Sequence, residues 1–153
     1  MGILDKIFGP QDSSEDDKYV LYMNLALNLI AVDGEQSDDE MNKFFDFFRS
    51  IPGMTESRYE RIHNRVVKQD GPLSYIDKIN EDEKFELINF LIDIANSDGY
   101  FHGEECAYII LLAMMLKLDV EKLYDFLNTN YHINQAELEV ATERLKENFK
   151  AHF

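Results

Sequence analysis

The chain contains few of the residues that cross-link a fold or break its helices. Among 153 residues there is one cysteine, Cys106, no tryptophan and only three prolines. A single cysteine excludes an intrachain disulfide and is typical of a reducing compartment. No apolar run approaches the ~20 residues of a membrane-spanning helix, and the first residues lack the hydrophobic region of a signal peptide. We therefore expect a cytoplasmic protein without a transmembrane segment.

Positive charge is also scarce. Fifteen basic residues stand against 30 acidic ones, which gives a formal net charge of -15. Such a field repels nucleic-acid phosphates and attracts cations and basic proteins. Nucleic-acid binding is therefore disfavoured, whereas protein partners and cations are favoured. The alternative interpretation is that the acidic surface only keeps the protein soluble.

Apolar residues make up 45% of the chain and recur with helical spacing, without convincing strand alternation. The cluster from Phe44 to Phe48 and the pair Met114-Met115 are predicted core residues. We predict an all-α fold, a compact bundle of about seven to eight helices. The expected helices are Tyr19–Val32, Met41–Ile51, one capped by Thr55, a short turn at Leu73–Ile79, one opened by Asn80, Glu104–Leu118, one capped by Asp119 and one from Asn134 to Phe149.

Composition divides the chain into four parts. Residues 1–10 form a short amphipathic helix with an apolar face, 11–17 an acidic linker, 18–130 the main helical domain, and 132–153 a C-terminal helix packed on it or extending from it. The N-terminal face can dock on the core, contact a membrane or bind a partner. Docking is favoured because six residues bury too little surface to hold a membrane alone. The face consists of Ile3, Leu4, Ile7 and Phe8.

One eight-residue pattern occurs twice, sixty-five positions apart: Asp33–Glu40 and Asp98–Glu105. Each copy follows a long apolar helix, begins with Asp-Gly, and ends with Glu at the start of another apolar helix. Glycine suits the end of a helix because it adopts the left-handed conformation at little cost. The recurrence predicts an internal duplication, and thus a bundle of two similar halves.

The two copies resemble the tellurite-resistance TerB family, also called TerB-like or DjlA N-terminal-like domains. The resemblance covers roughly residues 19–128. It implies an all-helical acidic domain with carboxylates on one surface, an association with bacterial tellurite-resistance and stress-response systems, divalent-cation binding and no established enzymatic activity. His102 and Gly103 depart from the usual polar capping residues. The stretches that carry the resemblance are Ala31-Val32-Asp33-Gly34 with Glu40, and Ala95-Asn96-Ser97-Asp98-Gly99-Tyr100-Phe101 with Glu104-Glu105.

The paired loops suggest a cation site. In each half an Asp leaves one helix and a Glu opens the next, so a tight loop can bring two carboxylates together. Hard cations such as Ca²⁺, Mg²⁺ or Mn²⁺ prefer oxygen ligands of this kind. The candidate ligands are Asp33, Glu40, Asp98 and Glu105, with Asp39 and Glu104 as weaker candidates.

The loops have two other interpretations. A standard EF-hand is rejected because its register would place Leu29, Ala31 and Ile94 at ligand positions, where they supply no side-chain oxygen. Helix capping remains an alternative: Glu40 can pair with the backbone of Ser37 in a capping box without any metal. The aspartates can bond turn N–H groups in the same way.

These patterns together predict a non-enzymatic TerB-like module that binds a divalent cation, partner proteins or both in a bacterial tellurite-resistance or stress-response context. Its partners would be proteins, including members of a membrane-associated complex, and a homodimer is left open. One alternative is a protein-interaction scaffold without metal. Another is a metal-dependent hydrolase using the clustered carboxylates, which would require a deep substrate pocket.

Overall fold

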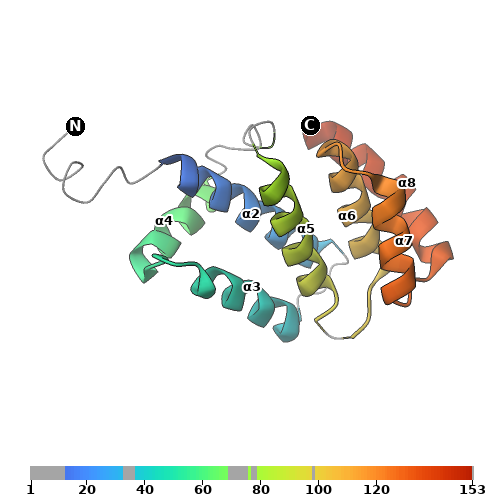
Figure 1. Cartoon of the computed structure of the whole chain (residues 1–153), viewed down its shortest axis with the longest axis horizontal. Helices are drawn as coiled ribbons and strands as arrows, with labels where there is room; N and C mark the ends of the chain where they lie inside the picture. Colours follow the sequence, from blue (N-terminus) through green and yellow to red (C-terminus); the bar gives the residue numbers. More distant parts are fainter. Residues whose placement is uncertain (1–12, 33–36, 69–75, 77–78, 98, 153) are drawn as a thin grey trace, which may run out of the picture.

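The computed structural model describes residues 13–32, 37–68, 76, 79–97 and 99–152. Within these residues the fold contains seven helices and no strand, which confirms the all-α prediction (Figure 1). The helices are α2 (Ser13–Ala31), α3 (Asp38–Ser50), α4 (Glu56–Val67), α5 (Glu81–Ala95), α6 (Gly103–Met115), α7 (Val120–Asn130) and α8 (Gln135–His152).

Two predicted elements lie wholly or mostly in parts of the chain that the structure does not describe. The amphipathic helix at 1–10 lies outside the described residues, and so does most of the turn at Leu73–Ile79. The acidic stretch at 11–17 differs from the expected linker, because α2 already begins at Ser13. The buried carboxylate of Asp16 is bound there by Arg58 and Arg61 of α4. The sequence-based boundary overlooked these long-range ion pairs.

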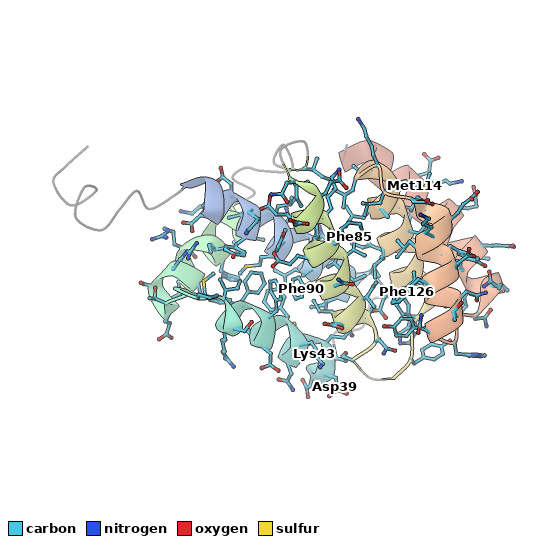
Figure 2. All side chains as sticks on the ribbon, in the orientation of Figure 1. Asp39, Lys43, Phe85, Phe90, Met114 and Phe126 are labelled. Atoms are coloured by element: carbon cyan, nitrogen blue, oxygen red, sulfur yellow. The ribbon has the colours of Figure 1, made fainter. Side chains whose placement is uncertain are left out.

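The core forms around α2, which packs against α3, α4, α5 and α6. Its side chains from Tyr19 to Met23 are all buried, as the nearly continuous apolar sequence predicts. Aromatic rings of α3 and α5 meet beside it: Phe47 stacks on Phe90 with 3.8 Å between the ring centroids. Figure 2 shows Phe90 between these two helices. One core prediction was wrong, because Met114 is exposed on α6 near its C-terminal end.

The helix starts follow the predicted capping signals. Asn80 accepts a hydrogen bond from the backbone N–H of Glu83, whose side chain accepts one from the backbone N–H of Asn80. Thr55 and Asp119 likewise cap α4 and α7 with their side-chain oxygens. These local bonds satisfy N–H groups that have no partner inside the helix.

The duplication in the sequence reappears as a duplication of helices. Helices α3 and α6 each have 13 residues, and their first residues, Asp38 and Gly103, are sixty-five positions apart. Helices α4 and α7 start at Glu56 and Val120, sixty-four positions apart. The packing also corresponds, since α3 contacts α5 and α6 contacts α2. The second half differs in its packing: α8 packs extensively on α6, and α7 contacts α6, whereas the equivalent helix α4 contacts α2.

Candidate functional site

The first Asp-Gly loop leads into α3 through a complete capping box. Ser37 is the N-cap, and its Oγ accepts a hydrogen bond of 3.1 Å from the backbone N–H of Glu40. In return, Oε1 of Glu40 accepts bonds from the Ser37 backbone N–H at 3.3 Å and from the Ser37 hydroxyl at 2.8 Å. The predicted capping role of Glu40 is therefore confirmed.

Capping uses only one of the two carboxylate oxygens of Glu40. The residue is 5% exposed, and its Oε2 is buried without a hydrogen-bond partner in the described part of the chain. A buried carboxylate oxygen without a donor loses its hydration and receives nothing in exchange. The position of Oε2 therefore suits a cation or another donor that the capping box does not provide.

The second loop leads into α6 and presents the equivalent glutamate. Glu105 lies in the first turn of α6 and is 1% exposed. Its position corresponds to that of Glu40, sixty-five residues earlier. The N-caps are also equivalent, but His102 makes no side-chain capping bond where Ser37 makes one. The two loops thus share a buried glutamate and differ in how the helix start is held.

The turn before α6 shows why the loops contain glycine. Gly99 has a φ of 84°, the left-handed conformation expected at the end of an apolar helix. Its N–H donates to the carbonyl oxygen of Asn96 at 3.0 Å, which closes the turn after α5. The corresponding Gly34 lies outside the described residues.

The other candidate ligands have different positions. Asp33 and Asp98 lie outside the described residues. Asp39 is exposed at the outer side of α3, near Lys43 (Figure 2). Glu104 is partly buried and forms an ion pair of 3.9 Å with Arg144 of α8. In the described part of the chain no three His, Cys, Asp or Glu residues form a group that could hold a metal ion. The four-carboxylate set, which includes the two aspartates outside the described residues, stays a prediction.

Helix α8 packs on α6 and covers the second loop. From the sequence alone it was open whether this helix packs on the domain or extends from it, and the contact with the loop was not predicted. The Tyr100 hydroxyl donates a hydrogen bond of 3.0 Å to Oε2 of Glu137. A Cβ built on Gly103 would lie 2.6 Å from the Cβ of Glu137, so α8 crosses the start of α6 at very close range. The sequence contains one sign of this close approach: Gly103 occupies the position that Asp38 occupies in the first half.

Burial makes the cysteine thiol unreactive. Cys106 is fully buried in α6, and this burial raises the pKa of its thiol to about 12. At neutral pH the thiol is therefore protonated and a poor nucleophile. The hydrogen bond to Glu137 raises the pKa of Tyr100 in the same direction, because it favours the protonated phenol. Neither group is prepared for nucleophilic attack.

A family model described as "Tellurite resistance protein TerB" matches residues 20–128. The chain belongs to the TerB family. The TerB match includes both Asp-Gly loops and their glutamates, and it ends before α8. No curated protein and no solved structure matches the chain. Among the described helices of this TerB protein, none is both long and apolar enough to cross a membrane.

Proposed function

We propose that this TerB protein is a non-enzymatic module whose two Asp-Gly loops bind a divalent cation, and that the loaded surface recruits partner proteins in a bacterial tellurite-resistance or stress-response complex. The complex would be cytoplasmic, with membrane-associated members. The predicted ligands are Glu40 and Glu105 together with Asp33 and Asp98, and Ca²⁺, Mg²⁺ and Mn²⁺ are the cations whose chemistry fits them.

One observation supports the proposal: the two halves bury equivalent glutamates, and Oε2 of Glu40 has no hydrogen-bond partner among the residues that the structure describes. A glutamate that only caps a helix can leave its second oxygen in water. Burying that oxygen costs free energy unless a donor or a cation compensates it. A buried glutamate at matched positions of a duplicated unit favours a shared role in binding a positive ligand.

The experiment is a thermal-denaturation titration with Ca²⁺, Mg²⁺ and Mn²⁺. A cation at 100 times its dissociation constant should stabilise the wild-type fold by about 2.7 kcal/mol. Asp98→Asn with Glu105→Gln should abolish this gain. The matched control is Glu121→Gln, which removes one negative charge from an exposed position at the start of α7 and should leave the gain intact. If all variants respond alike to every cation, the effect is bulk screening of charge and the cation site is refuted.

A metal-free interaction scaffold is the second candidate, favoured by the position of α8. This helix lies beyond the TerB match and covers the second loop. It also presents Val140, which is 73% exposed, on its outer side. A pull-down from the native cell compares the wild type, the Asp98→Asn/Glu105→Gln variant and Val140→Asp, with and without chelator. Partners that are lost only with Val140→Asp would support the scaffold and contradict recruitment through the loops.

A further inference from the structure

Helix α8 brings a positive charge to the second Asp-Gly loop from a distant part of the chain. It packs on α6 (Figure 1), and Nη2 of Arg144 pairs with Oε1 of Glu104, in the first turn of α6, at 3.9 Å. Two turns earlier on α8, Oε2 of Glu137 accepts the hydrogen bond from the Tyr100 hydroxyl. Residues seven apart lie on the same side of a helix. One side of α8 therefore contacts the loop at both places.

The packing of α8 fixes the place of this charge. Leu138, Ala141 and Leu145 form the buried stripe of α8, and Arg144 directly precedes the last of them. At the other end of the stripe, the glycine at position 103 lets α8 approach α6 very closely. The side chain of Arg144 is 56% exposed. Buried contacts thus hold the backbone of Arg144 in place, while its guanidinium lies at the rim of the loop in contact with water.

The corresponding position of the first half is arranged differently. Asp39, sixty-five residues before Glu104, is exposed, and Lys43 near it belongs to the same helix (Figure 2). Helix α6 has no lysine or arginine of its own. The start of a helix also carries the positive end of its dipole, which repels a cation. The carboxylate of Glu104 is therefore what attracts Arg144 to the start of α6.

The guanidinium and a divalent cation would compete for the same negative field. Glu104 directly precedes Glu105, which is a predicted cation ligand. Positive charges that share one group of carboxylates repel each other, so each lowers the affinity for the other. The coupling is reciprocal: Arg144 weakens cation binding by the same factor by which the cation weakens the hold of Glu104 on Arg144.

We propose that Arg144 is an internal competitor of the divalent cation at the second Asp-Gly loop and lowers the affinity of the loop for it. This inference rests on the proposed cation role of the loops. While Arg144 pairs with Glu104, part of the attracting charge is neutralised, so the loop responds only to higher cation concentrations. Cation binding in turn releases Arg144. Because α8 follows the residues of the TerB match, a helix outside the shared domain sets the affinity.

The test measures dissociation constants of Ca²⁺, Mg²⁺ and Mn²⁺ for the full chain by isothermal titration calorimetry at low ionic strength. Arg144→Gln removes the positive charge and should tighten binding roughly three- to tenfold. Arg144→Lys keeps the charge and should bind like the wild type. The matched control is Lys146→Gln, the same charge change about 200° around α8, at a residue that pairs with Glu143 of α8 itself. It should change the dissociation constant by less than about twofold.

A second background separates the local pairing from the general effect of charge. In a Glu104→Gln chain, adding Arg144→Gln should alter the affinity by less than about twofold, because the guanidinium has lost its carboxylate partner. Equal tightening by Arg144→Gln and Lys146→Gln would mean that only the net charge matters, and this result overturns the proposal.

The remaining outcomes distinguish this inference from the cation site itself. Suppose that Asp98→Asn with Glu105→Gln abolishes binding, whereas Arg144→Gln leaves the dissociation constant of the wild type unchanged. The cation site then stands and the role of Arg144 is refuted. If no variant binds any of the three cations, both are refuted. Circular dichroism verifies that each variant is folded, and Arg144→Ala gives the same reading if the glutamine variant fails to fold.

Discussion

Gly103 and Glu137 approach each other so closely that no side chain fits between them. A Cβ on Gly103 would lie 2.6 Å from the Cβ of Glu137 and 2.9 Å from its carbonyl carbon. The second contact is with backbone, which cannot move aside like a flexible side chain. Helix α8 can therefore pack at this place only because residue 103, at the start of α6, is a glycine.

Gly103→Ala should displace α8 and destabilise the fold by about 1–3 kcal/mol, the usual cost of overpacking. The expected loss of stability is informative, because alanine in a helix is otherwise more favourable than glycine by about 0.5–1 kcal/mol. Urea denaturation and limited proteolysis between α7 and α8 measure the effect. The control is Asp38→Ala, the equivalent position of α3, which should cost at most about 1 kcal/mol. A Gly103→Ala variant as stable as the wild type would show that α8 tolerates the added methyl group.

Glu40→Gln should separate capping from cation binding. Glutamine keeps a side-chain oxygen that can accept the bonds from Ser37, so without cation the free energy of unfolding should change by less than about 1 kcal/mol. The negative charge is lost, so the cation-dependent rise in melting temperature should fall strongly. Calorimetry with and without Ca²⁺, Mg²⁺ or Mn²⁺ provides both values. An unchanged cation response would leave Glu40 with its capping role alone.

Asp16→Asn should weaken the attachment of α2 to α4. The carboxylate accepts hydrogen bonds from Nε of Arg58 at 2.9 Å and from Nη2 of Arg61 at 2.8 Å. The amide replaces one acceptor oxygen with a donor that faces an arginine, so we expect a loss of about 1–3 kcal/mol in the free energy of unfolding. Asp46→Asn, an exposed change on α3, is the control and should be nearly neutral. Equal stability of the two variants would mean that water replaces the ion pairs without cost.

Stability should decline at alkaline pH because of Cys106. The pKa of its thiol is raised by burial from the usual 9.0 to about 12 in the folded protein. A raised folded-state pKa contributes stability that is complete below pH 9 and is lost as the pH rises to about 12. Over this window the unfolded chain has released the proton that the folded chain retains. The slope from this group is about 1.4 kcal/mol per pH unit.

Denaturation curves at pH 8 to 11 of the wild type and Cys106→Ala measure this contribution. The buried tyrosines contribute equally to both proteins, so only the difference in slope matters. The wild type should lose stability more steeply above pH 9. Parallel pH profiles would show that the thiol titrates at the same pH in the folded and unfolded chains.

Much of the helical framework was predictable from neighbouring residues. Ser37 with Glu40, and Asn80 with Glu83, form capping boxes because the partners are three residues apart and their bonds are local. The buried character of α2 follows from its almost uninterrupted apolar sequence. The sixty-five-residue repeat similarly indicated two halves before any packing was known, because equal sequence patterns favour equal local structures.

Tertiary structure alone decided the features that depend on residues far apart in the chain. Asp16 became part of a helix because Arg58 and Arg61 of another helix bind it, although its neighbours are typical of a linker. Met114 is exposed because none of the described elements covers that side of α6. The burial of Glu40 and Glu105 and the crossing of α8 at Gly103 likewise depend on how helices pack. Local sequence determines where a helix starts, whereas its burial depends on which distant surface approaches it.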